Sequence, residues 1–234
     1  MAPYCDAVIV AAGSGTRLGF QQPKALVPLA DKPMLIYSIA VFSEHPAIDN
    51  IILVVSESMV TAVQKIGLDD NIAVVIGGSE RWQSVRNGCA QSSAEWVLVH
   101  DAARPFITSA VIDSLLDKKL DYDCAITATP VVDTIRTYTH DRAGDTIDRS
   151  SLIRVGTPQL FRRNLLNEGF AFAENSQEPP TDEAMLMQAL HTPVGIAWGD
   201  PKNFKITTAE DLEIAEAIIK NNRRKKKLAP PPNY

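Results

Sequence analysis

The sequence predicts an α/β fold in which a Rossmann-like, mostly parallel sheet is flanked by helices and carries a protruding β-arm. Two features of the chain predict this fold. Up to Pro130, short apolar runs alternate with helical patterns, which is typical of parallel strands joined by right-handed crossover helices. Residues 131–155 instead alternate apolar and polar side chains around a turn, which predicts a hairpin. The hairpin is too poor in apolar residues for a buried sheet, so we expect it to leave the domain.

The predicted elements follow one another along the chain. A strand is predicted where small or β-branched residues run without charge, and a helix where apolar residues recur on one face. The predicted strands are 7–12, 51–55, 72–76, 96–99, 124–129 and 194–198, and the hairpin consists of 131–138 and 146–155 around a turn at 141–145. The predicted helices are 33–42, 58–66, 80–91, 111–120, 161–173, 181–190 and 208–220.

The chain is expected to form one domain with a short tail. Residues 1–222 are assigned to the domain, including the arm at 131–155, and residues 223–234 to a basic, proline-rich tail or linker. Disorder is expected from residue 221 onward, because that segment is basic and then rich in proline.

The composition is that of a soluble globular protein. The chain has 234 residues, of which 45% are hydrophobic and 22% are charged, enough for one α/β domain with a sizeable core. No apolar run reaches the roughly 18 residues of a membrane span, and no signal peptide is recognisable at the start. Cys5, Cys89 and Cys124 are not spaced for zinc or redox chemistry. We therefore expect a reduced, cytoplasmic protein with no membrane partner.

The charge is unevenly distributed. The formal net charge is −5, but five cations stand together at 223–227. Removing these five from the 23 basic residues leaves 18 against 28 acidic ones, so the rest of the chain carries −10. A body this acidic argues against nucleic acid as the partner. An anionic substrate would need a local cluster of cations.

A glycine-rich loop directly after the first predicted strand is the central motif. Gly13 and Gly15 free the backbone to turn tightly and to bring N–H groups close to a ligand. Arg17 and Lys24 are the only charges in the loop, which favours a polyphosphate ligand over the alternative, a βα turn with two solvated cations. The loop lacks the Gly-Lys-Ser/Thr of a Walker motif, and Pro23 interrupts the helix that a Rossmann loop would open.

Charged and polar side chains also follow the ends of other predicted strands. Ligands in open α/β sheets bind outside the carboxyl ends of the strands, so we expect one site that contains Lys24, Gly78, Arg81, Ser84, Asp101, Arg104 and Lys205. The glycine pair before Ser79 would let a flat base approach the backbone, and Ser84 either bonds this base or is a solvated helix residue. Asp101 would hold Mg²⁺ beside a polyphosphate, or else cap a helix. No catalytic or binding role is predicted for His100.

Several motifs occur together: AAGSGTRLG followed by Pro23-Lys24, GGSERWQSV, HDAARPF, VDTI, DRSSLIRVGTPQLF, TDEA and NFKIT. In this combination they resemble the 2-C-methyl-D-erythritol 4-phosphate cytidylyltransferase family over roughly residues 6–220. HDAARP and the GG-x-x-R-x-x-SV pattern are the most specific to this branch, whereas the glycine loop alone resembles sugar-phosphate nucleotidyltransferases in general. The chain departs from the family pattern at 25–26 and 153–156, where no cation is lost.

The resemblance implies a role for each matching residue. Arg17 and Lys24 would contact the CTP phosphates and stabilise the transition state, and Lys205 would bind both phosphates; these three are the predicted catalytic residues. CTP would also contact Ala11, Ala12, Gly13, Gly15, Gly78, Arg81, Ser84, Asp101 and Ala102, and Asp101 would hold Mg²⁺ or another divalent cation. Arg104 would support the acceptor. Thr134 and Arg149 would reach from the arm into the site of a neighbouring subunit, which implies a homodimer.

The implied reaction is the transfer of CMP from CTP to 2-C-methyl-D-erythritol 4-phosphate, with release of pyrophosphate, in non-mevalonate isoprenoid synthesis. The attacking phosphate is already ionised at neutral pH, so catalysis would consist mainly of positioning and charge neutralisation. Two alternatives stay open at this point. One is cytidylyl transfer to ribitol 5-phosphate, and the other is a nucleotide-binding regulator without turnover, which would need neither Lys24 nor Asp101.

Overall fold

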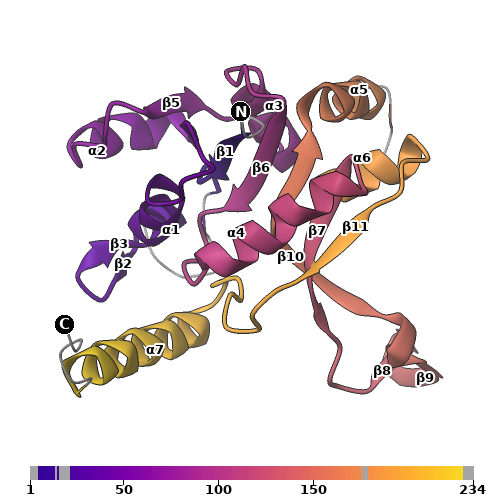
Figure 1. The fold of residues 1–234 in the computed structure, drawn as a ribbon. Helices are drawn as coiled ribbons and strands as arrows, with labels where there is room; N and C mark the ends of the chain where they lie inside the picture. The colour runs from indigo at the N-terminus through magenta and orange to yellow at the C-terminus, as the bar shows by residue number, and fades with distance from the viewer. Residues whose placement is uncertain (1–4, 14, 16–21, 175, 177–178, 229–234) are drawn as a thin grey trace, which may run out of the picture.

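A computed structural model of the chain describes residues 5–13, 15, 22–174, 176 and 179–228. Among these residues, seven strands form one sheet in the spatial order β11-β7-β10-β6-β1-β4-β5 (Figure 1). The strands are β1 (Cys5–Val10), β4 (Ile51–Val55), β5 (Ile72–Ile76), β6 (Trp96–Asp101), β7 (Cys124–Pro130), β10 (Ile153–Arg162) and β11 (Gly195–Trp198). Neighbouring strands are parallel except at β10, which runs antiparallel to β6 and β7. The predicted mostly parallel sheet is confirmed.

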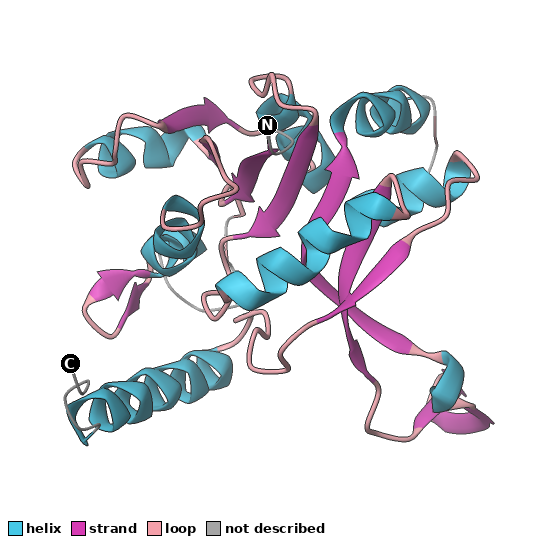
Figure 2. Ribbon diagram, viewed as in Figure 1, coloured by secondary structure: helices cyan, strands magenta, loops and turns pink. Residues whose placement is uncertain are grey.

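Helices cover both faces of this sheet (Figure 2). One face packs against α1 (Met34–Ser43), α2 (Val60–Gln64) and α4 (Ser109–Leu116), and the other against α3 (Arg81–Cys89), α5 (Arg163–Glu174) and α6 (Glu183–Ala189). Successive strand residues point to opposite faces, so in β1 Ala7 and Ile9 join the first core and Val8 joins the second. Burial on both faces explains why the central strands are apolar at nearly every position.

One strand of the sheet was not predicted. β10 lies between β6 and β7, and its Gln159 is paired with both Val99 and Ile126. The predicted helix at 161–173 is therefore wrong at its start, because Phe161 is still in the strand and α5 begins at Arg163. Pro158 indicated a break in the chain, since proline is rare inside a central strand. The strand accommodates it where its register with β7 shifts, between Gly156 and Gln159.

The C-terminal helix is longer than predicted. α7 runs over Ala209–Leu228, so the expected disorder is wrong for residues 221–228. The basic run consists of good helix formers, and no proline interrupts it before Pro230. The first half of α7 packs on β2 (Pro28–Leu29), which pairs with β3 (Lys32–Pro33), and Arg223 forms an ion pair with Asp31. Short 3₁₀ turns complete the fold: η2 (Lys24–Leu26), η3 (Glu57–Met59), η4 (Asp117–Leu120) and η5 (Arg149–Ser151).

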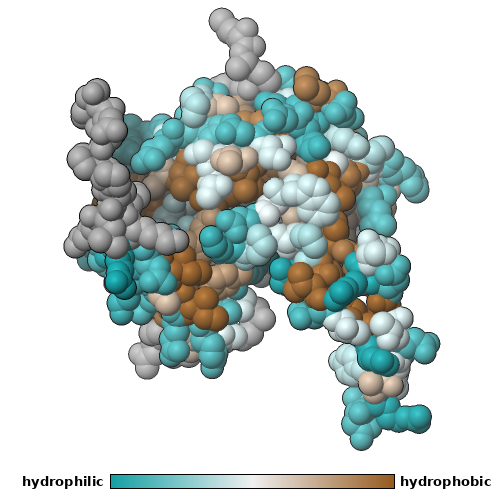
Figure 3. Space-filling view, turned by 60° about the horizontal axis from the view of Figure 1, so that its bottom comes forward, coloured by the Kyte–Doolittle hydropathy of each residue, from teal (hydrophilic) through white to brown (hydrophobic). Residues whose placement is uncertain are grey.

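The predicted arm is present. β7 and β10 stay paired out to Pro130 and Ile153, and beyond them β8 (Ile135–Thr139) and β9 (Arg142–Ile147) form a separate hairpin. In the space-filling view of Figure 3 the arm stands clear of the body, and its surface is mostly hydrophilic. The predicted turn at 141–145 is wrong. The chain reverses at His140 and Asp141, and His140 takes the positive φ of 54°. Residues 142–145 of the predicted turn lie within β9.

Across the described part of the chain, no helix combines the length and the apolar character that crossing a membrane would require.

Candidate active site

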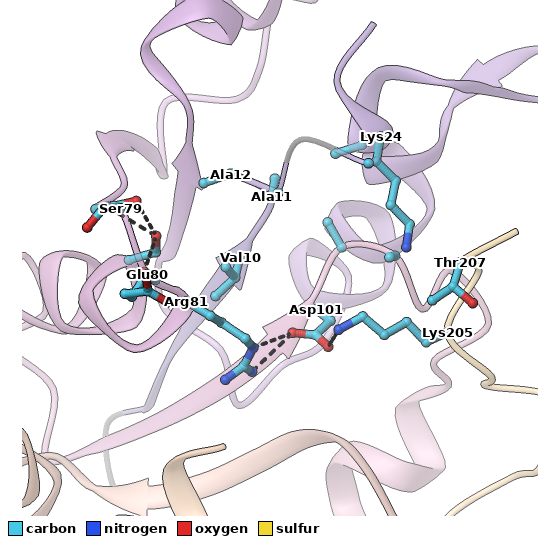
Figure 4. A pocket seen from close by; sticks show the side chains of 17 residues that line it. Val10, Ala11, Ala12, Lys24, Ser79, Glu80, Arg81, Asp101, Lys205 and Thr207 are labelled. Atoms are coloured by element: carbon cyan, nitrogen blue, oxygen red, sulfur yellow. Dashed lines mark hydrogen bonds and ion pairs between the residues drawn. The ribbon is translucent and has the colours of Figure 1, made fainter. Parts of the chain in front are cut away.

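A cavity of about 440 Å³ lies at the carboxyl ends of β1 and β6 (Figure 4). It gathers most of the residues that the sequence assigned to nucleotide binding. The lining includes Ala11, Ala12, Gly13, Gly15, Lys24, Gly78, Arg81, Ser84, Asp101, Ala102 and Lys205. These residues come from segments that are separated by up to two hundred positions in sequence, and the strand ends bring them together, as the rule for open α/β sheets predicts. Arg17 lies outside the described residues.

Asp101, the last residue of β6, is the charged centre of this cavity. Its Oδ1 accepts hydrogen bonds from Nε and Nη2 of Arg81 at 3.1 and 3.0 Å, and its Oδ2 accepts one from Nζ of Lys205 at 2.8 Å. Nε of Arg104 lies 4.0 Å from Oδ2. Burial alone would raise the pKa of Asp101, but the charges of Arg81 and Lys205 hold it well below its usual range. Asp101 is therefore an anion surrounded by cations.

A second carboxylate, Glu183, also holds Arg81. Nη1 of Arg81 donates to both carboxylate oxygens of Glu183, at 2.7 and 2.8 Å, and Glu183 is fully buried. Burial raises the pKa of Glu183, and the charge of Arg81 opposes this rise. Glu183 was not among the site residues predicted from the sequence. Its position at the start of a predicted helix suggested only a cap, which Asp182 provides for α6. Arg81 is thus first of all a bridge between β6 and α6.

The glycine pair after β5 is tightly packed. A Cβ on Gly77 would lie 2.7 Å from Oγ of Ser84 and 2.9 Å from Cβ of Ala12, so any side chain there would collide. Oγ of Ser84 accepts a hydrogen bond from the N–H of Gly78 at 3.1 Å and donates to the carbonyl of Glu80 at 3.2 Å. The hydroxyl of Ser84 is therefore engaged in fixing the turn that presents Gly78 to the cavity, which differs from both interpretations of Ser84 that the sequence suggested.

Lys24 is held close to the glycine loop. It opens the 3₁₀ turn η2, and a Cβ on Gly15 would lie 2.4 Å from Cβ of Lys24. Gly15 also has a φ of +67°, which residues with a side chain rarely adopt. The second glycine of the loop is thus needed both for its backbone conformation and for the close approach of Lys24. In Figure 4, the amino groups of Lys24 and Lys205 point into the same cavity.

The donor set around Asp101 decides which metal could bind there. Among the described residues, no group of three His, Cys, Asp or Glu side chains could hold a metal ion. Asp101 and Glu80 are the carboxylates that line the first cavity, and Arg81 and Lys205 occupy both oxygens of Asp101. A metal bound by protein alone does not fit this arrangement. A Mg²⁺ ion that arrives with phosphate ligands and needs one carboxylate does fit, provided that Lys205 releases Oδ2.

A second cavity, of about 230 Å³, adjoins the first. Lys205 lines both cavities, and the lining of the second also includes Arg104, Arg154, Thr157 and Asn203. Arg104, the predicted acceptor residue, donates from Nη1 to the carbonyl of Asn203 at 3.1 Å. Arg104 and Lys205 were predicted site residues. Asn203 and Thr157 were not, although they belong to the motifs NFKIT and DRSSLIRVGTPQLF. The lining of this second cavity has three cationic side chains, Arg104, Arg154 and Lys205, against one carboxylate, Asp200, so its net positive charge suits an anionic ligand.

The two residues predicted on the arm do not reach either cavity of their own chain. Thr134 and Arg149 are exposed and are absent from the lining of both cavities. Arg149 instead donates to the carbonyl of Val132 within the arm. Their predicted role therefore depends on a site outside this chain.

A glycine loop, a cation-lined cavity at the strand ends and a mostly parallel sheet define the class of this protein, which is a nucleotidyltransferase. The family model of 2-C-methyl-D-erythritol 4-phosphate cytidylyltransferase matches residues 5–221. The chain belongs to this family, and the resemblance found in its motifs is confirmed.

Individual relatives agree with this assignment. Two proteins of that name, from Alkaliphilus metalliredigens and Bacillus velezensis, are 39% and 40% identical to the chain; the first match covers 93% of both chains, and the second covers 91% of this chain and 94% of the relative. The crystal structure of 4-diphosphocytidyl-2C-methyl-D-erythritol synthase from Anaerococcus prevotii superposes with a TM-score of 0.83 at 27% identity. It covers 94% of this chain and all of that one, at 100%.

Proposed function

We propose that this chain catalyses the reaction for which its family is named, the transfer of a cytidylyl group from CTP to 2-C-methyl-D-erythritol 4-phosphate. The observation that carries the proposal is the junction of the two cavities at Lys205. One cavity has a glycine loop and Lys24 to bind a nucleoside triphosphate, and the other has Arg104 and Arg154 to bind an anionic acceptor. Lys205 lines both cavities, so it stands where the α-phosphate of the nucleotide and the phosphate of the acceptor would have to meet.

The first cavity would bind CTP. Its phosphates would lie between the N–H groups of the glycine loop and the amino groups of Lys24 and Lys205. Arg17, in the same loop, would add a further cation. The base would lie at the turn around Gly78, where backbone groups meet the ring edge. Cytosine and uracil exchange donor for acceptor at the 4-position, so backbone groups in a fixed turn would favour CTP over UTP.

The second cavity would bind the acceptor. An oxygen of the acceptor phosphate attacks the α-phosphorus of CTP and forms a new P–O bond. The bond from the α-phosphorus to the bridging oxygen breaks, and pyrophosphate leaves with the electron pair. The attacking oxygen is already anionic, so no side chain has to remove a proton. The work of the protein is to hold two anions together, and Lys24, Lys205 and Arg104 supply the charge that makes this possible.

A divalent cation such as Mg²⁺ is part of the proposal. It would neutralise phosphate charge when bound, and Asp101 would be its protein ligand after exchange of Lys205 from Oδ2 to a phosphate. The substitution Asp101→Asn tests this role, since turnover and the dependence on Mg²⁺ concentration should weaken together. Turnover that matches the wild-type protein at every Mg²⁺ concentration would exclude it.

The proposed active form is a homodimer that shares its sites through the arms. Four apolar side chains of the arm are partly or largely exposed: Val132, Tyr138, Ile147 and Val155. Such side chains would be buried against a second copy, and Thr134 and Arg149 would then reach the acceptor bound to that copy. A cytoplasmic setting is also proposed, because Cys5, Cys89 and Cys124 are all buried thiols without a disulfide.

The experiment that tests the proposed function is a pyrophosphate-release assay with the purified full chain. CTP and UTP are each combined with 2-C-methyl-D-erythritol 4-phosphate or with ribitol 5-phosphate. Rapid release with CTP and the methylerythritol acceptor, and at least tenfold slower release with the other three combinations, is the expected result. Preference for ribitol 5-phosphate would identify the acceptor as ribitol phosphate, and CTP binding without release under any condition would identify a regulator.

A further inference from the structure

His100 is a buried histidine beside the site that the proposed reaction does not use. It precedes Asp101 in β6, is fully buried, and lies with its ring centroid 5.3 Å from that of Phe42. It lines neither cavity. Both of its ring nitrogens nevertheless have polar partners on residues of the second cavity, which is more than packing alone requires.

The proton positions on the ring follow from those partners. Nε2 has two polar neighbours, the carbonyl oxygen of Arg104 at 3.1 Å and Oγ of Ser38 at 3.3 Å. The carbonyl can only accept, and the Ser38 hydroxyl can donate to that same carbonyl at 3.5 Å, so a proton on Nε2 satisfies both contacts. Nδ1 lies 3.2 Å from Oγ1 of Thr157, and this hydroxyl already accepts the backbone N–H of Asp101 at 3.0 Å. The proton of the Thr157 hydroxyl then has Nδ1 as its acceptor. The imidazole is therefore the neutral Nε2–H tautomer, with one donor and one acceptor in use.

These contacts are part of a closed ring of four residues. Nε2 of His100 donates to the carbonyl of Arg104, and Nη1 of Arg104 donates to the carbonyl of Asn203 at 3.1 Å. Nδ2 of Asn203 donates to the carbonyl of Thr157 at 3.0 Å, and the hydroxyl of Thr157 returns to Nδ1 of His100. The ring joins β6, the loop after it, β10 and the segment that leads to Lys205. Other hydrogen bonds also join these segments, such as the one from the N–H of Asp101 to Oγ1 of Thr157, but the ring is what connects Arg104, Asn203 and Thr157 to one another through His100.

Three members of the ring line the second cavity: Arg104, Thr157 and Asn203. The fourth member, His100, does not line the cavity and contacts the other members from the protein interior. We propose that His100 is a positioning residue for this cavity: it closes the ring that orients the three lining residues toward the acceptor. This inference rests on the proposed function insofar as the second cavity receives the acceptor. The first cavity has independent supports, since Asp101 also pairs with Val10 across the sheet and is held by Arg81 and Lys205.

The test compares Michaelis constants for the two substrates. His100→Leu removes both ring contacts in a side chain of similar bulk. We expect the KM for the acceptor to rise about tenfold, as the loss of two neutral hydrogen bonds suggests. The KM for CTP should stay within about twofold of the wild-type value. His100→Gln keeps a donor near the Nε2 position and should recover part of the acceptor KM, which a role in packing alone would not predict.

A matched control is His45, another buried histidine, whose Nε2 lies 3.1 Å from Asp113 and which lines neither cavity. His45→Gln should leave the KM for both substrates unchanged. Equal rises in both KM values for His100→Leu, or the same rise for His45→Gln, would mean that burial alone is responsible and would overturn the proposal.

Two further measurements separate this inference from the proposed function. If Arg104→Lys raises the KM for the acceptor and His100→Leu does not, the cavity assignment stands and the positioning role is wrong. If neither raises it, the second cavity does not receive the acceptor, and the inference falls with that assignment. Should His100→Leu fail to fold, ¹⁵N NMR of the labelled wild-type protein decides, since a cationic or Nδ1–H imidazole would contradict the ring.

Discussion

The two parts of the molecule that carry the predicted site residues are built in opposite ways. Around Asp101, side chains from α3, α6 and the segment before α7 meet in a buried network of ion pairs. On the arm, Arg149 is exposed and bonds to a carbonyl of the arm itself. The first region completes its contacts within one chain. The second presents exposed residues that line neither cavity of their own chain, and in the proposed homodimer they would contact the acceptor of the second copy.

Exposure reinforces this comparison. Asp101 is 7% exposed and Glu183 is 0% exposed, whereas Tyr138 on the arm is 81% exposed and Val132 is 67% exposed. A two-stranded hairpin is at best marginally stable without a further surface. Substitutions in the first region should therefore affect the stability of the single chain, and substitutions on the arm should affect assembly and activity instead.

The largest effect is expected at Lys24. Lys24→Ala should lower kcat by about 10²–10³, as loss of one charge-stabilising donor typically does, with a much smaller change in CTP affinity. Steady-state kinetics measures kcat, and titration of the enzyme with CTP in the absence of the acceptor measures the CTP affinity separately. Lys32→Ala is a matched control, because Lys32 is an exposed lysine in β3 that does not line the first cavity. A rise in KM alone would mean that Lys24 only binds.

The second largest effect is expected at Asp101, whose ionisation should contribute to the free energy of unfolding. The folded-state pKa of Asp101 is held below its unfolded value of about 3.9, so its contribution to the free energy of unfolding is complete above about pH 5 and is lost as the pH falls below 4. Asp101→Asn leaves Arg81 without one of its two carboxylate partners, but Glu183 still compensates the charge of this partly exposed guanidinium. The cost should therefore lie below the roughly 3–5 kcal/mol of a buried charge left without any partner. Urea unfolding should show the largest difference from the wild-type protein at pH 7 and a smaller one at pH 3. A difference independent of pH would contradict this assignment.

The sequence predicted the parts of this network that are local. The strands were visible because 51–55 and 72–76 are short β-branched runs, and their predicted bounds agree with β4 and β5. Asp101 was visible because it lies two residues after the predicted strand 96–99, and Lys205 because it belongs to the NFKIT motif. Glu183 was not, because its partner Arg81 is 102 positions away and an acidic residue in the first turn of a helix has a sufficient local explanation as part of a cap.

The same limit explains the errors in the fold. β10 contains Pro158, which locally argues against a strand, and only its position between β6 and β7 overrides that preference. The turn of the arm was predicted over residues 141–145, but cross-strand pairing of Ala143 with Tyr138 puts the reversal at His140 and Asp141. For β10, contacts with distant segments outweighed the local preference of Pro158. In the arm, the register of the hairpin itself determines where the chain reverses.

A smaller effect on stability and a clear effect on activity are expected on the arm. Arg149→Ala should lower turnover at least tenfold if Arg149 contacts the acceptor of the neighbouring subunit. The free energy of unfolding should change by less than about 0.5 kcal/mol, as is usual for an exposed side chain. Urea unfolding together with the pyrophosphate assay measures both. Arg142→Ala is the control, because Arg142 is another exposed cation of the arm, on strand β9. It should leave turnover unchanged if the effect is specific to Arg149.

The last prediction tests whether the site is shared. Lys24→Ala and Arg149→Ala are refolded or co-expressed together, each being weakly active alone. In a mixed dimer with shared sites, one site combines both lesions, and the other has Lys24 from one chain and Arg149 from its partner. Random pairing makes about half of the dimers mixed, so roughly a quarter of all sites should regain wild-type composition. The mixture should then reach about a quarter of the wild-type rate, well above the mean of its two components. If mixed dimers form and the rate stays at that mean, Arg149 acts within its own chain, and the contrast between the self-contained cavity and the arm that serves a neighbour is wrong.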